Sequence, residues 1–350
     1  MIPVAPGQFG HAWLETRLGA PPGSLRAMSG APLGTGQMSD SFRLTLDWHG
    51  HAGPATIVAK CPSHNEHSRH IAVALGNYMK EVRWYNELAP LSMVPRPHCY
   101  HAEIADNSLD FVLLLADCAP AVQGNQLAGA GAATLQPAVA ALAALHAPFW
   151  NADITGRFPW LATETRPLIE AALPGLAEGF AARYADRLAP EVIAVARDLA
   201  ANVKAFHDWM PSAFSVVHGD FRLDNLLFAP DGGVFVVDWQ TVGLGCPFAD
   251  LAYLIGTGIG DPGERAVVEK GLFEDYIAAL EGLGVSVARD AAWRDYRVYA
   301  LTGVLVAIFA SMNVERTVRG DEMFAVMAER PARQALALGS LGLITGKSDG

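Results

Sequence analysis

The chain has 350 residues, of which 51% are hydrophobic and 17% are charged, and its formal net charge is -11. This composition is typical of a folded globular protein that is long enough for two domains or lobes. The negative charge argues against a general nucleic-acid binder. The most apolar stretch, residues 300–312, is too short to span a membrane, so we expect no membrane partner.

The cysteines predict neither a disulfide framework nor a zinc site. Cys61, Cys99, Cys118 and Cys246 are scattered and form no CxxC pair. Such spacing is typical of a reducing compartment. The N-terminus lacks the basic start and long apolar core of a signal peptide. We therefore expect a soluble, cytoplasmic protein.

Short β-branched runs and turn residues dominate the first 117 residues, which predicts a mostly antiparallel sheet with one main helix. In chain order we expect a short helix within residues 1–27, two strands flanking the glycines of APLGTGQMSDSFRLTLDW, the strand ATIVAK, a helix over residues 64–88, and the strands VPRPHCYHAEI and DFVLLLAD.

Helical patterns dominate residues 118–350. An Ala/Leu-rich helix follows GNQLAGAG, residues 162–208 are helical with Pro interruptions, and helices resume from residue 250. Between them we expect the strands FSVVHG and VFVVDW to pair through the turn APDGG. The predicted fold is α+β, with a small β-rich N-lobe (1–117) and a larger, mostly helical C-lobe (118–350).

The stretch VVHGDFRLDNLLFAPDGGVFVVDWQ carries the clearest chemistry. Asp220 follows a strand and a glycine, Asn225 lies five residues later, and Asp238 ends the next predicted strand. The expected hairpin would bring the oxygens of Asn225 and Asp238 together as ligands for Mg²⁺, which takes further ligands from water and a phosphate. Asp220 would then accept a hydroxyl proton. Arg222 would contact the transferring phosphoryl group or form a structural salt bridge. This order of residues indicates phosphoryl transfer from a nucleotide to a hydroxyl or amine.

A nucleotide-binding region is expected upstream of that stretch. Gly34 and Gly36 lie between two predicted strands, and Ser39 stands where a third glycine might be. Without Cβ atoms the backbone can approach phosphates closely. The strand TIVAK ends in Lys60, which would contact the α- and β-phosphates.

A glutamate on the following helix would hold Lys60 in place. Glu81 lies 21 residues after the lysine, and Glu87 is the rival. The two cannot face the same way, because six residues is a poor helical repeat. We favour Glu81.

Taken together, these motifs resemble the aminoglycoside phosphotransferase and choline kinase-like family, over nearly the whole chain. HGD replaces the kinase HRD, and DWQ replaces DFG. Within that family the chain looks most similar to the kinase domains attached to acyl-CoA dehydrogenases and to ecdysteroid kinase-like proteins. The resemblance implies a protein kinase-like bilobal fold that uses ATP or GTP with Mg²⁺.

The resemblance also implies a role for each matching residue. Asp220 would be the catalytic base, and Asn225 and Asp238 would be Mg²⁺ ligands. Lys60, supported by Glu81, would contact the phosphates, and adenine would contact the backbone at Asp117 and Cys118. Asp250 and His218 would support the loop.

The acceptor is expected to be a small molecule with a hydroxyl group. Only 12 residues separate Asp238 from Asp250, and no APE motif follows, so a protein kinase activation segment does not fit. Residues 296–312 are apolar, which fits a helix core or an apolar wall, and three tryptophans have the same two interpretations: Trp150, Trp160 and Trp293.

We mildly favour a neutral or lipophilic alcohol or a hydroxyacyl compound, with an aminoglycoside or choline/ethanolamine as the alternative. Glu315, Arg316 and Arg319 are candidates for contact with a polar end of the acceptor. A catalytically silent nucleotide-binding regulatory module is a further hypothesis, which the presence of the lysine, the base and the metal aspartate opposes. Protein partners are not indicated.

Overall fold

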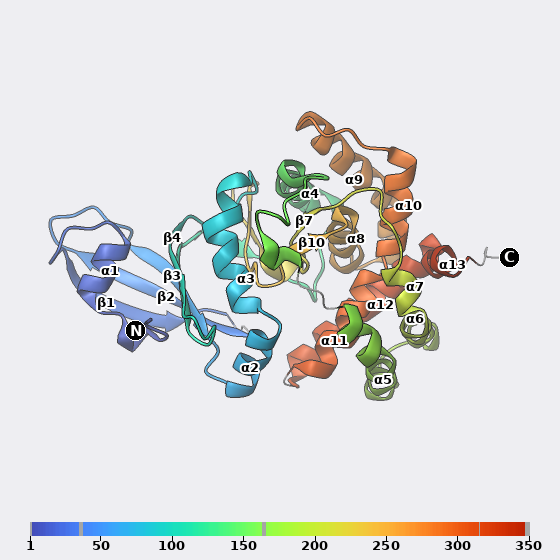
Figure 1. The fold of residues 1–350 in the computed structure, drawn as a ribbon, viewed down its shortest axis with the longest axis horizontal. Coiled ribbons are helices and arrows are strands. Elements are labelled where there is room, and N and C mark those ends of the chain that lie inside the picture. Colours follow the sequence, from blue (N-terminus) through green and yellow to red (C-terminus); the bar gives the residue numbers. More distant parts are fainter. Residues whose placement is uncertain (1, 35–37, 163–165, 315, 347–350) are drawn as a thin grey trace. The chain divides into compact units, whose positions relative to one another are not determined.

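The computed structural model describes residues 2–34, 38–162, 166–314 and 316–346. The chain divides into two compact units. Unit 1 consists of Met1–Ala121 together with Phe235–Thr241, and unit 2 of Val122–Val234 and Val242–Gly350. Figure 1 shows the elements of both units. The segment Phe235–Thr241, which contains Asp238, therefore clusters with the β-rich unit although it lies late in the sequence.

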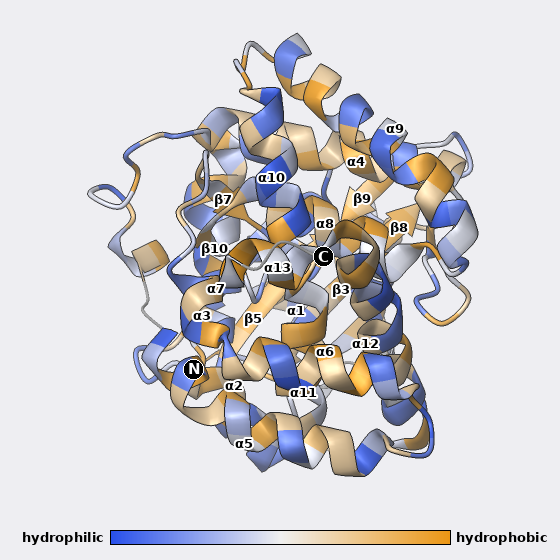
Figure 2. Ribbon diagram, turned by 90° about the vertical axis from the view of Figure 1, so that its right-hand side faces the viewer, coloured by the Kyte–Doolittle hydropathy of each residue, from blue (hydrophilic) through white to orange (hydrophobic). Residues whose placement is uncertain are grey.

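Unit 1 is built on a five-stranded antiparallel sheet, as the sequence predicted. The strand order is β1-β2-β3-β5-β4, so the hydrophobic FVLLLA strand lies inside the sheet. Figure 2 shows β5 in the colour of hydrophobic residues. The strands are β1 (Leu25–Pro32), β2 (Ser39–Trp48), β3 (Thr56–Pro62), β4 (Cys99–Ile104) and β5 (Phe111–Ala116).

The alternation of side chains along β3 gives the sheet two different faces. Ile57, Ala59 and Cys61 are fully buried and belong to one hydrophobic cluster, which also includes Leu14 of helix α1 (His11–Arg17). Because successive residues of a strand point to opposite faces, Lys60 points away from that cluster. The sheet thus supplies an apolar face for its core and places one lysine on the other face.

The prediction of one continuous helix over residues 64–88 is wrong. The chain forms α2 (Glu66–Ala74), α3 (Asn77–Arg83) and a π-helical turn, Trp84–Leu88. Gly76, between α2 and α3, has a φ of +72°, a left-handed conformation that glycine adopts at little cost and that interrupts a helix. Sequence periodicity alone did not reveal this break.

Unit 2 is mostly helical, and its hydrophobic core joins helices α5, α6, α8, α11 and α12. Figure 1 shows α5, α6, α11 and α12 as neighbours. Figure 2 shows α8 as predominantly hydrophobic, which fits its burial. The helices are α4 (Ala132–His146), α5 (Arg166–Tyr184), α6 (Pro190–Ala201), α7 (Val203–His207), α8 (Pro247–Gly258), α9 (Pro262–Gly282), α10 (Arg289–Tyr299), α11 (Thr302–Asn313), α12 (Val318–Leu338) and α13 (Ser340–Thr345).

The expected pairing of FSVVHG with VFVVDW is wrong. Strand β7 (Ser215–Val217) pairs with β10 (Gly243–Gly245), and the strand that precedes the APDGG turn is β8 (Leu226–Phe228), which pairs with β6 (Val122–Gln123). Strand β9 (Val234–Val236) follows the turn. Strand β8 was not expected, because its three residues are too few to display an alternating pattern.

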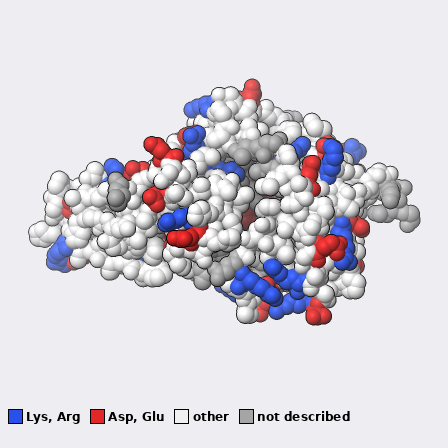
Figure 3. All heavy atoms as spheres, turned by 60° about the horizontal axis from the view of Figure 1, so that its bottom comes forward, with Lys and Arg blue, Asp and Glu red and all other residues white. Residues whose placement is uncertain are grey.

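Two helical stretches, Ala132–Phe149 and Arg289–Asn313, are long and apolar enough to cross a membrane by length and composition alone. About half of each stretch is buried inside the structure (50% and 56%). Core helices of soluble proteins have the same length and composition, so these stretches do not by themselves indicate a membrane protein. The face in Figure 3 is mainly uncharged, with acidic and basic side chains distributed among the other residues.

Candidate active site

In unit 1, Lys60 is held between two carboxylates. Its Nζ lies 2.6 Å from Oε2 of Glu81 and 2.8 Å from Oδ1 of Asp238. The lysine side chain is 9% exposed, so its charge is compensated within the protein rather than by solvent. Burial alone would lower the pKa of Lys60, but the Asp238 and Glu81 carboxylates outweigh it and raise that pKa. The lysine is therefore fixed in its charged form.

Glu81, rather than Glu87, is the partner of this lysine. Tyr78, Glu81 and Val82 are buried on one face of α3, as residues three and four apart should be. Burial raises the pKa of Glu81, and the ammonium of Lys60 opposes that effect. Glu87 is about one-third exposed, with Nη1 of Arg83 3.9 Å away from its Oε1. The structure thus decides between the two glutamates that the sequence left as rivals.

The backbone around Asp238 is constrained. Asp238 has a φ of +68°, which is uncommon for a residue with a side chain and is frequent at functional sites. The N–H of the next residue, Trp239, donates to Oε1 of Glu81 at 3.2 Å. The Trp239 ring stacks on Trp84 with centroids 3.8 Å apart. These contacts fix the position of Asp238 relative to Lys60 and Glu81 within unit 1.

The glycine-rich segment is partly described. Gly34 has a φ of +74°, a conformation that suits glycine, whereas Gly36 lies outside the described residues. Ser39 is buried at the start of β2. Tyr78 donates its hydroxyl to the carbonyl oxygen of Met38 at 2.6 Å, which ties this end of the segment to α3.

Asp117 and Cys118 follow directly after β5. The contacts of the Asp117 carboxylate include the Arg43 guanidinium at 2.7 Å, the N–H of Ala119 at 3.1 Å and the side chain of Thr56. Burial opposes the charge of Asp117, but these contacts prevail and lower its pKa. Burial raises the pKa of the Cys118 thiol to about 11. The Asp117 side chain is thus engaged within unit 1, and contact of adenine with the backbone at Asp117 and Cys118 remains a prediction.

In unit 2, the HGD sequence forms a loop that is anchored by Asp250. Gly219 has a φ of +80°, which lets the chain turn sharply after β7. The Asp250 carboxylate accepts the N–H groups of His218 at 2.6 Å and Gly219 at 3.0 Å. Asp250 is 2% exposed and lies in the first turn of α8. Its expected bracing role fits this geometry.

Three side chains donate to the carboxylate of Asp220. Tyr253 donates its hydroxyl to Oδ1 at 2.9 Å, and Asn225 donates Nδ2 to Oδ2 at 2.8 Å. Arg222 donates Nε to both oxygens at 3.1 and 3.2 Å. Because the side chain of Asp220 is 20% exposed, it is oriented by these donors and still open to solvent. A carboxylate in this state can receive a proton from a hydroxyl group.

Arg222 is engaged in salt bridges within its own loop. Its guanidinium also contacts Asp224 at 2.8 Å, and Nη1 lies 3.6 Å from Sδ of Met323 on α12. Burial alone would lower the pKa of Arg222, but the Asp220 charge is the largest opposing influence and the pKa is raised. The sequence left two interpretations of Arg222, a structural salt bridge or contact with a phosphoryl group. The structure shows the salt bridge. Contact with a phosphoryl group remains a prediction.

The two predicted Mg²⁺ ligands have the right chemistry. Asn225 uses its Nδ2 on the carbonyl and carboxylate oxygens of Asp220, which leaves its Oδ1 as the atom for a cation. Asp238 supplies a carboxylate that is already paired with the cationic Lys60. Among the described residues, no group of three or more His, Cys, Asp or Glu side chains could hold a metal by itself. Mg²⁺ typically takes one or two protein ligands and completes its shell with water and phosphate, and its binding at Asn225 and Asp238 remains a prediction.

The sequence analysis missed three residues that support the Asp220 loop. The fully buried Gln126 accepts the N–H of Leu223 at 3.1 Å. His146 places Nε2 3.3 Å from the Asp250 carboxylate. Tyr253, as described above, donates to Asp220. The only signal for Tyr253 was its position three residues after Asp250. Gln126 and His146 lie in loop and Ala-rich contexts that carry no signal.

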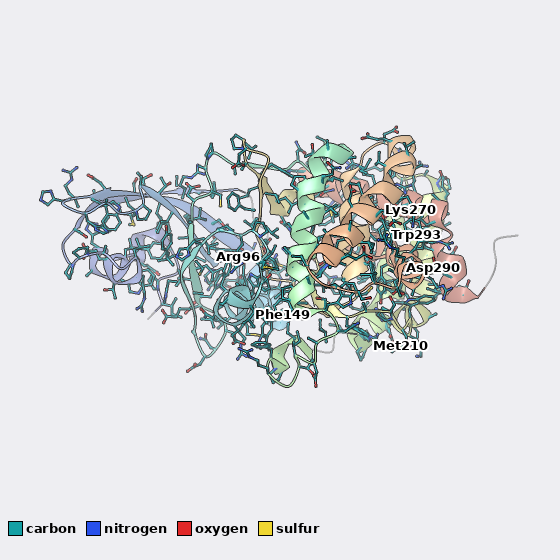
Figure 4. The ribbon with its side chains drawn as sticks, turned by 90° about the horizontal axis from the view of Figure 1, so that it is seen from above. Arg96, Phe149, Met210, Lys270, Asp290 and Trp293 are labelled. Carbon is teal, nitrogen blue, oxygen red and sulfur yellow. The ribbon has the colours of Figure 1, made fainter. Side chains whose placement is uncertain are left out.

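The apolar residues 296–312 lie mostly in the core of unit 2. Tyr296 is fully buried and donates to Glu269 at 2.8 Å. Trp293 stacks on Tyr296, with the Nζ of Lys270 3.9 Å from its ring centroid, and Figure 4 shows Lys270 and Trp293 beside each other. The core interpretation therefore fits Tyr296. Of the candidate polar contacts, Arg316 pairs with Asp321 at 2.7 Å, Arg319 is exposed, and Glu315 lies outside the described residues.

Comparisons with known proteins agree with this geometry. The family model described as "Phosphotransferase enzyme family" (APH) matches residues 50–285. Acyl-CoA dehydrogenase family member 10 of Mus musculus is 56% identical over 41 residues, which cover 11% of this chain and only 4% of the mouse protein. This relative agrees with the resemblance to kinase domains attached to acyl-CoA dehydrogenases.

Solved structures share the fold. Choline kinase from Cryptosporidium parvum has a TM-score of 0.56 at 10% identity, with 91% of each chain covered. Macrolide 2'-phosphotransferase from Brachybacterium faecium has a TM-score of 0.52 at 15% identity, covering 90% of this chain and 96% of that one. At these identities the similarity establishes the kinase-like α+β fold, as the sequence predicted.

Proposed function

Because the chain belongs to the phosphotransferase enzyme family, we propose that it transfers the γ-phosphate of ATP or GTP to a hydroxyl group of a small molecule, with Mg²⁺, as a soluble cytoplasmic enzyme. The observation that carries this proposal is the Asp220 loop. Its carboxylate is oriented by three donors, partly exposed, and supported by Asp250 through backbone N–H groups. Such preorganisation suits a group that must accept a proton at one position.

The reaction follows from the roles of these groups. The acceptor hydroxyl gives its proton to Asp220 while its oxygen attacks the γ-phosphorus, and the bond from that phosphorus to the β–γ bridging oxygen breaks. Lys60, held by Glu81, contacts the nucleotide phosphates, and Gly34, Gly36 and Ser39 let the backbone approach them. Adenine meets the backbone at Asp117 and Cys118.

Asn225 and Asp238 would hold the Mg²⁺, which neutralises charge on the β- and γ-phosphates when it is bound. Lys60 contributes a fixed positive charge whether or not a nucleotide is present, because its pKa is raised. Arg222 would turn from Asp220 toward the transferring phosphoryl group, for which its guanidinium is well suited. The residues of this chain thus supply positioning, charge and one proton acceptor.

A neutral or lipophilic alcohol, or a hydroxyacyl compound, is the acceptor class that we favour. Met323 lies beside Arg222, so an acceptor that approaches Asp220 would meet an apolar side chain of α12. Nearby carboxylates are already paired, Asp224 with Arg222 and Asp321 with Arg316. A polycationic acceptor such as an aminoglycoside, or the choline of the structurally similar kinase, would need carboxylates that are open to it.

The alternative of another class is a silent nucleotide-binding regulatory module. Such a module would have no use for an oriented base. The buried hydrogen bond from Tyr253 to Asp220 therefore favours the enzyme, because a module that only binds nucleotide would not need it.

The first test is nucleotide consumption with Mg²⁺ against pools of small hydroxyl compounds, including aminoglycosides, choline, sterols, simple alcohols and hydroxyacyl thioesters. We expect pool-dependent turnover in the native chain. Asp220→Asn should lower kcat by about 10³-fold or more and should leave nucleotide binding intact. Turnover that survives in Asp220→Asn would remove this residue from its role. Tight Mg-nucleotide binding with no turnover in any pool would favour the regulatory module.

A further inference from the structure

Tyr253 differs from the other groups around Asp220 because no ligand role falls to it. Arg222 is shared with Asp224 and is proposed to contact phosphate, and Asn225 is proposed to hold the metal. The Tyr253 hydroxyl donates to Oδ1 of Asp220 at 2.9 Å and is 2% exposed. Tyr253 is thus a neutral, buried donor. It can keep its hydrogen bond to the Asp220 carboxylate while Arg222 and Asn225 contact a ligand.

One face of α8 brings Tyr253 to this position. Asp250, Tyr253 and Thr257 are spaced three and four residues apart, so they lie along the same side of the helix. Asp250 accepts the N–H groups of the two residues before Asp220, and Tyr253 contacts Asp220 itself. The carbonyl oxygen of Thr257 accepts Nε2 of Gln126, whose Oε1 accepts the N–H of Leu223. The helix therefore contacts the loop before and at its reactive carboxylate, and it is linked to Leu223, after that carboxylate, through Gln126.

The ring of Tyr253 has little freedom to move. A Cβ at Gly303 of α11 would lie 3.4 Å from Cδ2 of Tyr253 and 2.5 Å from Cγ of Pro331, so α11 and α12 pack closely beside the ring. Burial raises the pKa of the Tyr253 hydroxyl well above its ordinary value, and the Asp220 charge adds to this effect. The hydroxyl therefore remains protonated and able to donate.

We propose that Tyr253 is a positioning residue that holds the Asp220 carboxylate in the orientation that accepts the proton of the acceptor hydroxyl. This inference rests on the proposed function. A charge-assisted hydrogen bond from a rigid ring restricts the rotation of the carboxylate, and catalysis depends steeply on such orientation. Tyr253 itself contacts neither nucleotide nor acceptor in this role, so its loss should affect kcat and leave nucleotide affinity unchanged.

The test compares Tyr253→Phe with Tyr296→Phe in the full chain. Tyr296 is a matched control, because it is also fully buried in unit 2 and donates to a carboxylate, Glu269, at 2.8 Å.

Mg-ATP turnover is measured with the acceptor pool and as background hydrolysis to inorganic phosphate. We expect Tyr253→Phe to lower kcat about tenfold or more, by the strength of a hydrogen bond to a charged group, with KM for ATP within about twofold. Tyr296→Phe should keep kcat within about twofold of the native value.

Equal kcat values for the two variants would overturn the proposal, and so would a parallel rise in KM for ATP that accounts for the loss. Failure of the proposed function has a different signature, since the native chain itself would then turn over neither ATP nor GTP with any pool.

A double-mutant cycle of thermal unfolding tests, independently of activity, the contact between Tyr253 and Asp220 on which the inference depends. If Tyr253 holds Asp220, the fall in Tm for Tyr253→Phe combined with Asp220→Ala will be smaller than the sum of the two single falls. Additive falls would show that the two side chains are not coupled and would overturn the proposal independently of activity.

Discussion

The Lys60 group of unit 1 and the Asp220 loop of unit 2 are both buried polar clusters, but different interactions hold them. In unit 1, the charge of Lys60 is compensated by two carboxylates, those of Glu81 and Asp238. In unit 2, carboxylates accept backbone N–H, amide and hydroxyl groups, as Asp250 does from the loop and Asp220 does from Tyr253. The first cluster is held mainly by ion pairs, whereas the second adds backbone, amide and hydroxyl donors to the ion pairs of Arg222.

This difference separates the tasks of binding and catalysis. If the proposed roles hold, a nucleotide phosphate at Lys60 would compete with Asp238, and a metal at Asp238 would compete with Lys60, so ligand binding in unit 1 would exchange existing partners. In unit 2, Tyr253 and Asn225 would keep the Asp220 carboxylate in place even when Arg222 turns toward a phosphate, so this carboxylate would reorganise little during the reaction. We therefore expect changes in unit 1 to affect nucleotide affinity and stability, and changes in the loop to affect kcat.

The largest effect is expected from Lys60→Met. This change leaves the Glu81 carboxylate, which is 2% exposed, without its cation. Removing one partner of a buried ion pair typically costs about 3–5 kcal/mol. Chemical denaturation at pH 8 should reveal a loss of this size, together with loss of nucleotide binding. Lys270→Met is the control, because Lys270 is 54% exposed and its pairing with Glu274 should contribute little.

The cost of Lys60→Met should depend on pH. The pKa of Glu81 is raised by burial and is opposed by Lys60, so losing the lysine raises it further. When the pKa of a carboxyl group is higher in the folded state than in the unfolded state, the folded protein loses stability as pH rises through the folded-state pKa. The difference between native and variant free energies of unfolding should therefore be smaller at pH 5.5 than at pH 8. An equal difference at both values would contradict the charge-based account of unit 1.

A smaller loss is expected from Asp250→Asn in the loop. An amide keeps one acceptor oxygen but turns an NH₂ group toward the N–H groups of His218 and Gly219, and an unsatisfied buried donor costs about 1–3 kcal/mol. The comparison predicts that kcat falls more than tenfold while KM for ATP changes little. Steady-state kinetics and denaturation would measure both, with the exposed Asp208→Asn as control. A change confined to KM would argue against a preorganised loop.

The sequence predicted the components of both clusters better than their arrangement. Lys60 was identifiable because an alternating apolar run leads to it, although β3 continues to Pro62. Asp220 and Asn225 were identifiable because their spacing is distinctive. The break at Gly76 was not, since a left-handed glycine within a helical pattern leaves the periodicity largely intact. The β7–β10 pairing was also missed, because three-residue strands are specified by tertiary contacts rather than by local pattern. Tyr253 belongs to the same class, since its role depends on the position of α8 beside the loop.

The smallest expected effect concerns Cys118, which tests whether ligand contact in unit 1 extends to the end of β5. Burial raises the pKa of this thiol to about 11, so alkylation by iodoacetamide should be slow at pH 7 and accelerate about tenfold per pH unit up to pH 10. Mg-ATP should slow this reaction several-fold if adenine covers the backbone at Asp117 and Cys118.

Cys61 provides the internal control, because it is fully buried and its pKa is raised to about 12. Mass spectrometry of the labelled peptides separates the two sites. If saturating nucleotide protects neither cysteine while it still binds the protein, adenine does not contact this backbone, and the ligand contacts of unit 1 are restricted to the phosphate end around Lys60.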